Sequence, residues 1–166
     1  MNYTTKQIAE ITQSQLIGDK DLPIQHIAFD SRNIYSTHKT AFIAINTKNN
    51  SGEKYIPQVI EKGIKIIISE TFFDDYEGVT WIIVENSVKF LQDLAKYHVE
   101  NAQLKTIGIT GSNGKTIVKE WLYQCLWNEL PTVKSPKSFN SQIGLPISLL
   151  EISKKHELGI FEVGIS

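Results

Sequence analysis

The sequence predicts an α/β protein with largely parallel sheets, organised as a small mixed α/β domain followed by the first part of a second parallel-sheet domain. Short apolar runs alternate with segments of helical periodicity along the 166 residues, and this alternation favours parallel strands joined by helices. The run at 64–69 is apolar and β-branched almost throughout, which is typical of a strand buried on both faces. The pattern restarts near residue 103, so we expect domains at 1–103 and 104–166.

Composition and charge exclude several classes of protein. Seventeen Lys and Arg against eighteen Asp and Glu give a formal net charge of −1, which gives no reason to expect nucleic acid. The N-terminus lacks the apolar core of a signal peptide, and no stretch approaches the roughly 20 apolar residues of a membrane span. The single cysteine, Cys125, cannot form an internal disulfide, as suits a reducing compartment. We expect a cytoplasmic protein without a nucleic-acid or membrane partner.

The first domain begins with a short helix and ends with a longer one. Its expected elements, in order, are a helix at 5–13 capped by Thr4 or Thr5, strands at 24–29 and 41–45, a helix at 55–62 ended by Gly63, strands at 64–69 and 79–84, and a helix starting at Asn86 or Ser87.

The second part contains fewer strands than a complete open sheet. Its expected elements are a strand at 105–110, a tight loop at 111–114, a helix at 115–129, an extended segment around Val133, a helix within 140–150 with Pro146 in its first turn or at a break, and a strand at 158–163. An open sheet usually has about four to six strands, so we expect this domain to continue beyond the chain. We place Cys125 in the core and interpret Trp81, Trp121 and Trp127 as packing residues.

The strongest local signal is the string G-S-N-G-K-T at 111–116, between an apolar strand and a helical pattern. Glycines let successive N–H groups form an anion-binding nest, and a helix N-terminus adds partial positive charge. In such a P-loop the lysine reaches the outer phosphates and the hydroxyl binds Mg²⁺; the alternative is a glycine turn with a chance lysine. The expected phosphate-binding residues are Gly111, Ser112, Asn113, Gly114, Lys115 and Thr116.

Other candidate positions are ambiguous on the residues alone. Asp30, Ser31 and Arg32 follow a predicted strand and by themselves fit a strand-ending turn. Glu162 lies in an apolar strand, where a carboxylate is costly unless it is paired, bound to metal or on a solvated face; the last two are equally open. Asn140 either caps the following helix or lies near the phosphates.

The longer string G-I-T-G-S-N-G-K-T at 108–116 resembles the ATP-binding signature of the Mur ligases, which build the peptide stem of peptidoglycan. Three other parts of the chain, at 29–45, 138–146 and 161–166, resemble segments of these ligases in the same order. The strings F-D-S-R at 29–32 and A-F-I-A-I at 41–45 resemble the uridine-substrate domain of the later-acting ligases. S-F-N-S-Q-I-G-L-P at 138–146 resembles the asparagine-rich segment of the branch that adds D-alanyl-D-alanine. F-E-V-G-I-S at 161–166 is similar to the strand whose glutamate binds Mg²⁺.

The resemblance implies a uridine-nucleotide substrate-binding domain at 1–103 and the truncated start of a central P-loop ATPase domain at 104–166. The implied cofactors are ATP and Mg²⁺, and the implied substrates are UDP-N-acetylmuramoyl-tripeptide and D-alanyl-D-alanine. The 138–146 and 161–166 segments are most similar to a bifunctional form, which implies an alanine racemase domain further along the parent chain.

The resemblance also assigns roles to the candidate residues. Lys115 and Glu162 become catalytic, Thr116 and Glu162 bind the metal, and Asn140 joins the ATP site. Asp30, Ser31 and Arg32 become substrate-binding residues, since a hydroxyl and a guanidinium suit contacts with uracil or a diphosphate.

Overall fold

The computed structural model describes residues 1–34, 36–48 and 50–164. The chain divides into two compact units, Met1–Phe90 and Leu91–Ser166. The division falls within helix α3 (Ser87–Ala102), whereas the boundary predicted near residue 103 lies at the C-terminal end of the same helix. The functional boundary at 103 stays a prediction.

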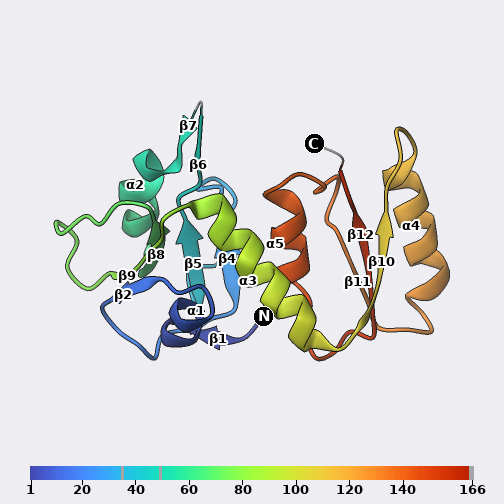
Figure 1. Cartoon of the computed structure of the whole chain (residues 1–166), viewed down its shortest axis with the longest axis horizontal. Coiled ribbons are helices and arrows are strands. Elements are labelled where there is room, and N and C mark those ends of the chain that lie inside the picture. Colours follow the sequence, from blue (N-terminus) through green and yellow to red (C-terminus); the bar gives the residue numbers. More distant parts are fainter. Residues whose placement is uncertain (35, 49, 165–166) are drawn as a thin grey trace. The chain divides into compact units, whose positions relative to one another are not determined.

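The first unit is built on a five-stranded sheet (Figure 1). Its strand order is β2-β9-β8-β5-β4, and every neighbouring pair is parallel except β2 with β9. The strands are β2 (Gln15–Ile17), β4 (His26–Ala28), β5 (Thr40–Ile43), β8 (Ile66–Ser69) and β9 (Thr80–Ile83). Two small antiparallel pairs accompany them: β1 (Tyr3–Thr4) with β3 (Pro23–Ile24), and β6 (Asn46–Thr47) with β7 (Asn50–Ser51).

The helices of this unit begin and end where local chemistry stops them. In α1 (Thr5–Ile11), Thr4 and Gln7 form a reciprocal capping box. A 3₁₀ turn, η1 (Gly52–Tyr55), leads into α2 (Ile56–Glu61). Gly63 follows α2 at φ 97°, a backbone conformation that favours glycine.

The core of the first unit lies between the central strands and α2. All four residues of β8, three isoleucines and Ser69, are buried, as expected for a strand buried on both faces. Its core cluster contains Phe42, Ala44, Ile56, Val59, Ile64, Ile67 and Trp81.

The N-terminus of α3 is held by a carboxylate from the end of β8. The backbone N–H and hydroxyl of Ser87 donate to Glu70 Oε1 at 2.7 and 2.8 Å, and Asn46 Nδ2 donates to Glu70 Oε2 at 3.1 Å. Asn86 Oδ1 accepts from the N–H of Lys89, so Asn86 is the side-chain cap. Burial raises the pKa of Glu70, but the hydrogen bonds from Ser87 and Asn46 outweigh it and the net shift is downward.

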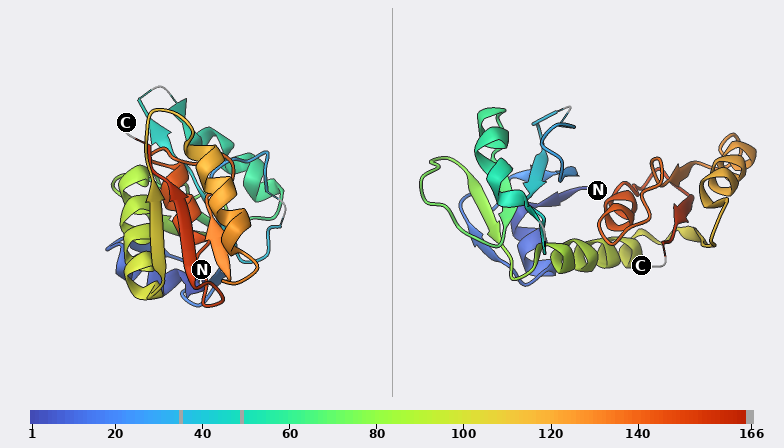
Figure 2. Two further views of the ribbon diagram at one scale, coloured as in Figure 1. Left: turned by 90° about the vertical axis from the view of Figure 1, so that its right-hand side faces the viewer. Right: turned by 90° about the horizontal axis from the view of Figure 1, so that it is seen from above.

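The second unit is a three-stranded parallel sheet with a helix on each face. The strand order is β10-β12-β11. Its elements are β10 (Lys105–Ile109), α4 (Lys115–Leu126), β11 (Thr132–Lys134), α5 (Gly144–Leu150) and β12 (Leu158–Glu162). Figure 2 shows α4 and α5 on opposite sides of these strands, and both contact β12. The mainly parallel α/β class is therefore confirmed in both units.

Two packing predictions on α4 and its C-terminal flank are wrong. Cys125 is exposed rather than in the core, and Trp121 and Trp127 are 66% and 52% exposed, whereas Trp81 is buried as predicted. The physical reason is that the three-stranded sheet packs against the side of α4 that carries the buried Lys119, whereas Trp121 lies on the exposed side. Among the described residues, no helix combines the length and apolar character needed to cross a bilayer.

Candidate functional site

The loop between β10 and α4 has the backbone of a phosphate-binding turn. Gly111 and Gly114 have φ values of 147° and 79°, which a residue with a side chain adopts only under strain. Gly114 is the N-cap of α4, and no side chain caps this helix. The first N–H groups of α4 therefore lack a side-chain acceptor, and the loop is exposed. This combination suits an anion.

Lys115 lies back over the loop that precedes it. Its Nζ donates to the carbonyl oxygen of Gly111 at 2.6 Å. The ammonium is thus held at the loop, where phosphate oxygens would become its acceptors. Thr116 follows it in the first turn of α4 and is exposed, so its hydroxyl is accessible to a ligand of this loop.

Glu162 is placed next to the loop by strand register. In the parallel β10–β12 pair, Ile109 is the partner of Glu162, and the N–H of Val163 donates to the Ile109 carbonyl at 2.9 Å. Glu162 therefore sits at the carboxyl end of β12, where open α/β sheets bind ligands. Its side chain is 0% exposed, so the solvated-face interpretation is wrong.

A lysine that the sequence analysis did not single out pairs with this carboxylate. Lys119 Nζ lies 3.1 Å from Glu162 Oε1 and 3.3 Å from Glu120 Oε1. Lys119 is fully buried, and its Nζ also donates to the carbonyl oxygens of Ser135, at 2.9 Å, and Lys137. The ammonium thus ties α4 to β12 and to the segment after β11.

Asn140 lies beside Glu162 and does not cap α5. Its Nδ2 donates to Glu162 Oε2 at 3.4 Å, and its carbonyl accepts from the N–H of Gly164 at 3.0 Å. A Cβ at Gly164 would lie 2.4 Å from that carbonyl oxygen, so the close approach requires glycine. The N–H of Gly144, at the start of α5, instead donates to Ser141 Oγ at 3.0 Å. The expected residues 165 and 166 of this segment lie outside the described residues.

The residues around Glu162 fit a divalent cation that arrives with phosphates. Glu162 Oε1 is buried without a hydrogen-bond partner despite its ion pair, so the carboxylate has unused acceptor capacity. Across the described ranges, no three His, Cys, Asp or Glu side chains are grouped to hold a metal by themselves. Mg²⁺ usually binds through one or two carboxylates together with phosphates and water. Glu162 offers a carboxylate of that kind.

The Asp30–Arg32 segment in the first unit is internally braced. Asp30 Oδ1 accepts from Arg32 N at 3.0 Å and Arg32 Nε at 2.9 Å, and Asp30 Oδ2 accepts from Arg32 Nη2 at 2.9 Å. These hydrogen bonds lower the pKa of the Asp30 carboxyl from 3.8 to about 2, and those from the Arg32 side chain have the largest effect. The Arg32 side chain is 83% exposed, whereas Ser31 is buried and its carbonyl accepts from Lys62 Nζ at 2.6 Å. Arg32 is therefore the accessible contact group.

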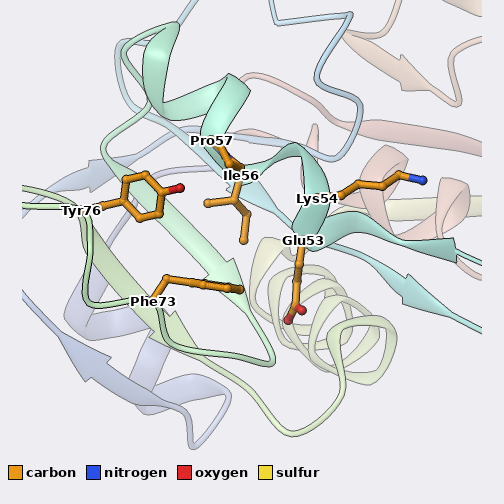
Figure 3. A pocket seen from close by; sticks show the side chains of 6 residues that line it. All are labelled: Glu53, Lys54, Ile56, Pro57, Phe73 and Tyr76. Carbon is orange, nitrogen blue, oxygen red and sulfur yellow. The ribbon is translucent and has the colours of Figure 1, made fainter.

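Figure 3 shows a separate pocket of about 270 Å³ in the first unit, which the sequence analysis missed. None of the three residues at 30–32 lines it. Its walls come from η1, the start of α2 and the segment after β8, and its lining residues are Glu53, Lys54, Ile56, Pro57, Phe73 and Tyr76.

The structure thus brings Lys115 to Gly111 and Asn140 to Glu162, and it places Glu162 beside the strand that enters the loop. The missed residue with the clearest sequence signal is Lys119. It lies three residues after Thr116, on the same side of a helix, and directly follows the apolar Ile117 and Val118.

Fold and loop together define a P-loop α/β protein, and comparison with known proteins specifies the family. The family model for the Mur ligase middle domain matches residues 109–166. Because relatives that are 33% and 32% identical over 86% and 99% of this chain join this match, the chain belongs to the Mur ligase family.

Within that family, many of the similar proteins add D-alanyl-D-alanine. A UDP-N-acetylmuramoyl-tripeptide–D-alanyl-D-alanine ligase from Borreliella burgdorferi is 33% identical over 86% of this chain and 33% of its own length. A ligase from Alkaliphilus oremlandii that is named for adding 2,6-diaminopimelate is 38% identical over 70% of this chain and 24% of its own length.

Solved structures of MurF are also similar to this chain. Crystalline MurF from Acinetobacter baumannii has a TM-score of 0.87 at 32% identity, covering 99% of this chain and 36% of that one. MurF from Thermotoga maritima, in complex with ADP, has a TM-score of 0.67 at 31% identity, covering 82% of this chain and 31% of that one. The chain spans about a third of the length of the relatives it matches.

Proposed function

We propose that this chain is part of an ATP-dependent amide ligase that joins D-alanyl-D-alanine to UDP-N-acetylmuramoyl-tripeptide in peptidoglycan precursor synthesis. The observation that carries the proposal is the register of β10 with β12, which places the buried Glu162 beside the strand that enters the Gly111–Thr116 loop. Relatives named for this reaction, and a relative crystallised with ADP, support it.

In this proposal the terminal carboxylate of the tripeptide attacks the γ-phosphate of ATP, giving an acyl phosphate and ADP. The amine of D-alanyl-D-alanine then attacks the acyl carbon, an amide forms, and phosphate leaves. The loop N–H groups of Gly111, Ser112, Asn113 and Gly114, together with the Lys115 ammonium, offset the negative charge of the transferring group.

Mg²⁺, when bound, would neutralise charge on the phosphate oxygens. Thr116 and Glu162 would hold it, directly or through water. Asn140 donates to the Glu162 carboxylate, so in this proposal it orients that group at the edge of the ATP site.

Asp30, Ser31 and Arg32 are proposed as contacts for the uridine nucleotide, with the exposed Arg32 guanidinium facing the diphosphate. Asp30 fixes that guanidinium by two side-chain hydrogen bonds, which reduces the entropy lost on binding. We place the enzyme in the cytoplasm, without nucleic acid or membrane as a partner. An alanine racemase domain in the parent protein is part of the same proposal.

A second candidate is a ligase of the same family that adds a single amino acid. The identity with the diaminopimelate-adding ligase favours it, whereas the 138–146 segment and the structural relatives favour the dipeptide-adding branch. A panel of amine substrates, tested on the full-length enzyme, separates the two. We expect the 166-residue chain alone to release no phosphate in response to both substrates.

Calorimetric titration of UDP-N-acetylmuramoyl-tripeptide into this chain tests the proposal without needing turnover. We expect saturable binding that is lost in Arg32→Ala and kept in Lys6→Ala. Lys6→Ala is a matched control because it removes one exposed basic partner of an ion pair, Lys6–Glu10, in the same unit. Binding of Mg-ATP without binding of any uridine ligand would leave the P-loop assignment standing and remove the substrate assignment.

A further inference from the structure

The Glu162 carboxylate has a cationic partner within the protein itself. Lys119 Nζ lies 3.1 Å from Glu162 Oε1, and both side chains are fully buried. An ionised carboxylate cannot be buried alone without a large desolvation penalty, so a partner of opposite charge is a physical requirement at this position.

Lys119 is fixed in place by more than this ion pair. An ammonium has three donors and no acceptor, and Lys119 uses two of the donors on the carbonyl oxygens of Ser135 and Lys137. Glu120 lies 3.3 Å away as a second carboxylate. These contacts hold the Lys119 Nζ in place beside Glu162.

Lys119 offsets the charge of Glu162 but leaves hydrogen-bond acceptors of the carboxylate unused. Glu162 Oε1 has no hydrogen-bond partner, and Oε2 has one long bond of 3.4 Å from Asn140. The attraction to Lys119 is therefore mainly Coulombic, and lone pairs remain for another ligand.

We propose that Lys119 is the resident counter-ion of Glu162, a positioning residue that prevents a bare divalent cation from binding there and makes metal entry depend on nucleotide phosphates. The inference rests on the proposed function for the metal-binding role of Glu162. A bare dication at Glu162 would meet the like charge of Lys119 at close range in a poorly solvated site. A nucleotide brings the negative charge that outweighs this repulsion, so metal and nucleotide bind together.

The test uses Mn²⁺ as a spectroscopic substitute for Mg²⁺, with binding to the nucleotide-free chain followed by electron paramagnetic resonance. Outer-sphere partners typically change metal affinity by about 10- to 100-fold, and we expect Lys119→Met to bind Mn²⁺ tighter than the unaltered chain by a factor in that range. The gain should vanish in Lys119→Met/Glu162→Gln. Lys119→Arg, which keeps the charge, should show no gain.

Lys134→Met is the matched control. It removes an ammonium from the same unit, but that ammonium pairs with the half-exposed Glu120 and leaves the Lys119–Glu162 pair intact. We expect no gain of Mn²⁺ affinity. A folded Lys119→Met chain with unchanged Mn²⁺ affinity, or a gain that persists in the double variant, overturns the proposal.

A second measurement covers the case in which Lys119→Met does not fold. In the unaltered chain, Mn²⁺ binding that depends on Glu162 should be present with ADP and absent without it, with Glu162→Gln as reference. Equal Glu162-dependent binding in both conditions contradicts the counter-ion role. Failure of the nucleotide assignment is a different result: no nucleotide binds to the unaltered chain at all, whatever Mn²⁺ does.

Discussion

Replacing Lys115 by Met removes the ammonium that donates to the Gly111 carbonyl of the loop, while keeping an unbranched side chain. Lys115 Nζ donates to the Gly111 carbonyl at 2.6 Å. An ammonium has three donors, so it can keep this contact and still donate to phosphate oxygens. This contact therefore does not have to be broken when a nucleotide binds.

The expected loss of Mg-ATP affinity can be calculated from the hydrogen bonds that Lys115 donates to phosphate. A hydrogen bond to a charged group contributes about 1.5–3 kcal/mol, and each ~1.4 kcal/mol is a tenfold change in affinity. One such bond predicts that Lys115→Met binds Mg-ATP about 10- to 150-fold more weakly than the unaltered chain. AMP, which lacks the outer phosphates, should lose much less.

Calorimetric titration with Mg-ATP and with AMP measures both values. Lys105→Met is the matched control, because Lys105 is exposed at the start of β10, at the opposite end of that strand from the loop. It changes the net charge equally and should leave both affinities unchanged. Equal Mg-ATP affinities for Lys115→Met and the unaltered chain would refute the phosphate role of Lys115.

Two further predictions concern the first unit. Asp30→Asn should lower the free energy of unfolding at pH 7 but hardly change it near pH 2. The pKa of Asp30 in the folded chain, about 2, lies below its ordinary value of 3.8. The stabilisation by ionised Asp30 is therefore complete well above pH 3.8 and is lost as the pH falls toward 2. Urea titrations at several pH values measure this, and a constant difference would contradict it. Glu70→Gln should cost about 1–3 kcal/mol by leaving the Ser87 and Asn46 donors poorly paired, measured by thermal or urea unfolding; an unchanged midpoint would show that Glu70 does not anchor α3.

Elements with a strong local cause could be predicted from the sequence. The capping box before α1, the glycine after α2 and the doubly buried strand β8 each depend on neighbouring residues. The 24–29 strand was predicted as one piece, but the structure has β3 and β4 on either side of Gln25. The two pieces pair with different partners, β1 and β5, and periodicity within one segment carries no information about partners.

In the candidate site, too, features with a local cause could be predicted and features that depend on distant residues could not. The loop glycines and Lys115 form a contiguous pattern, so sequence reasoning could find them. The environment of Glu162 depends on long-range contacts: Lys119 comes from α4, Ser135 follows β11, and Asn140 precedes α5. No spacing rule links these residues, because strand register brings them together. For the same reason the exposure of Trp121 could not be predicted from the apolar face of α4 alone.

The most direct test of the central claim is whether the P-loop and Glu162 form one Mg-nucleotide site. The measurement is the ATP affinity of the unaltered chain and of Glu162→Gln, each with Mg²⁺ and with a chelator. We predict that removing Mg²⁺ weakens ATP binding to the unaltered chain by a larger factor than it weakens ATP binding to Glu162→Gln, which keeps Thr116. The same Mg²⁺ dependence in both chains would contradict the account, because Glu162 would then have no part in holding the metal.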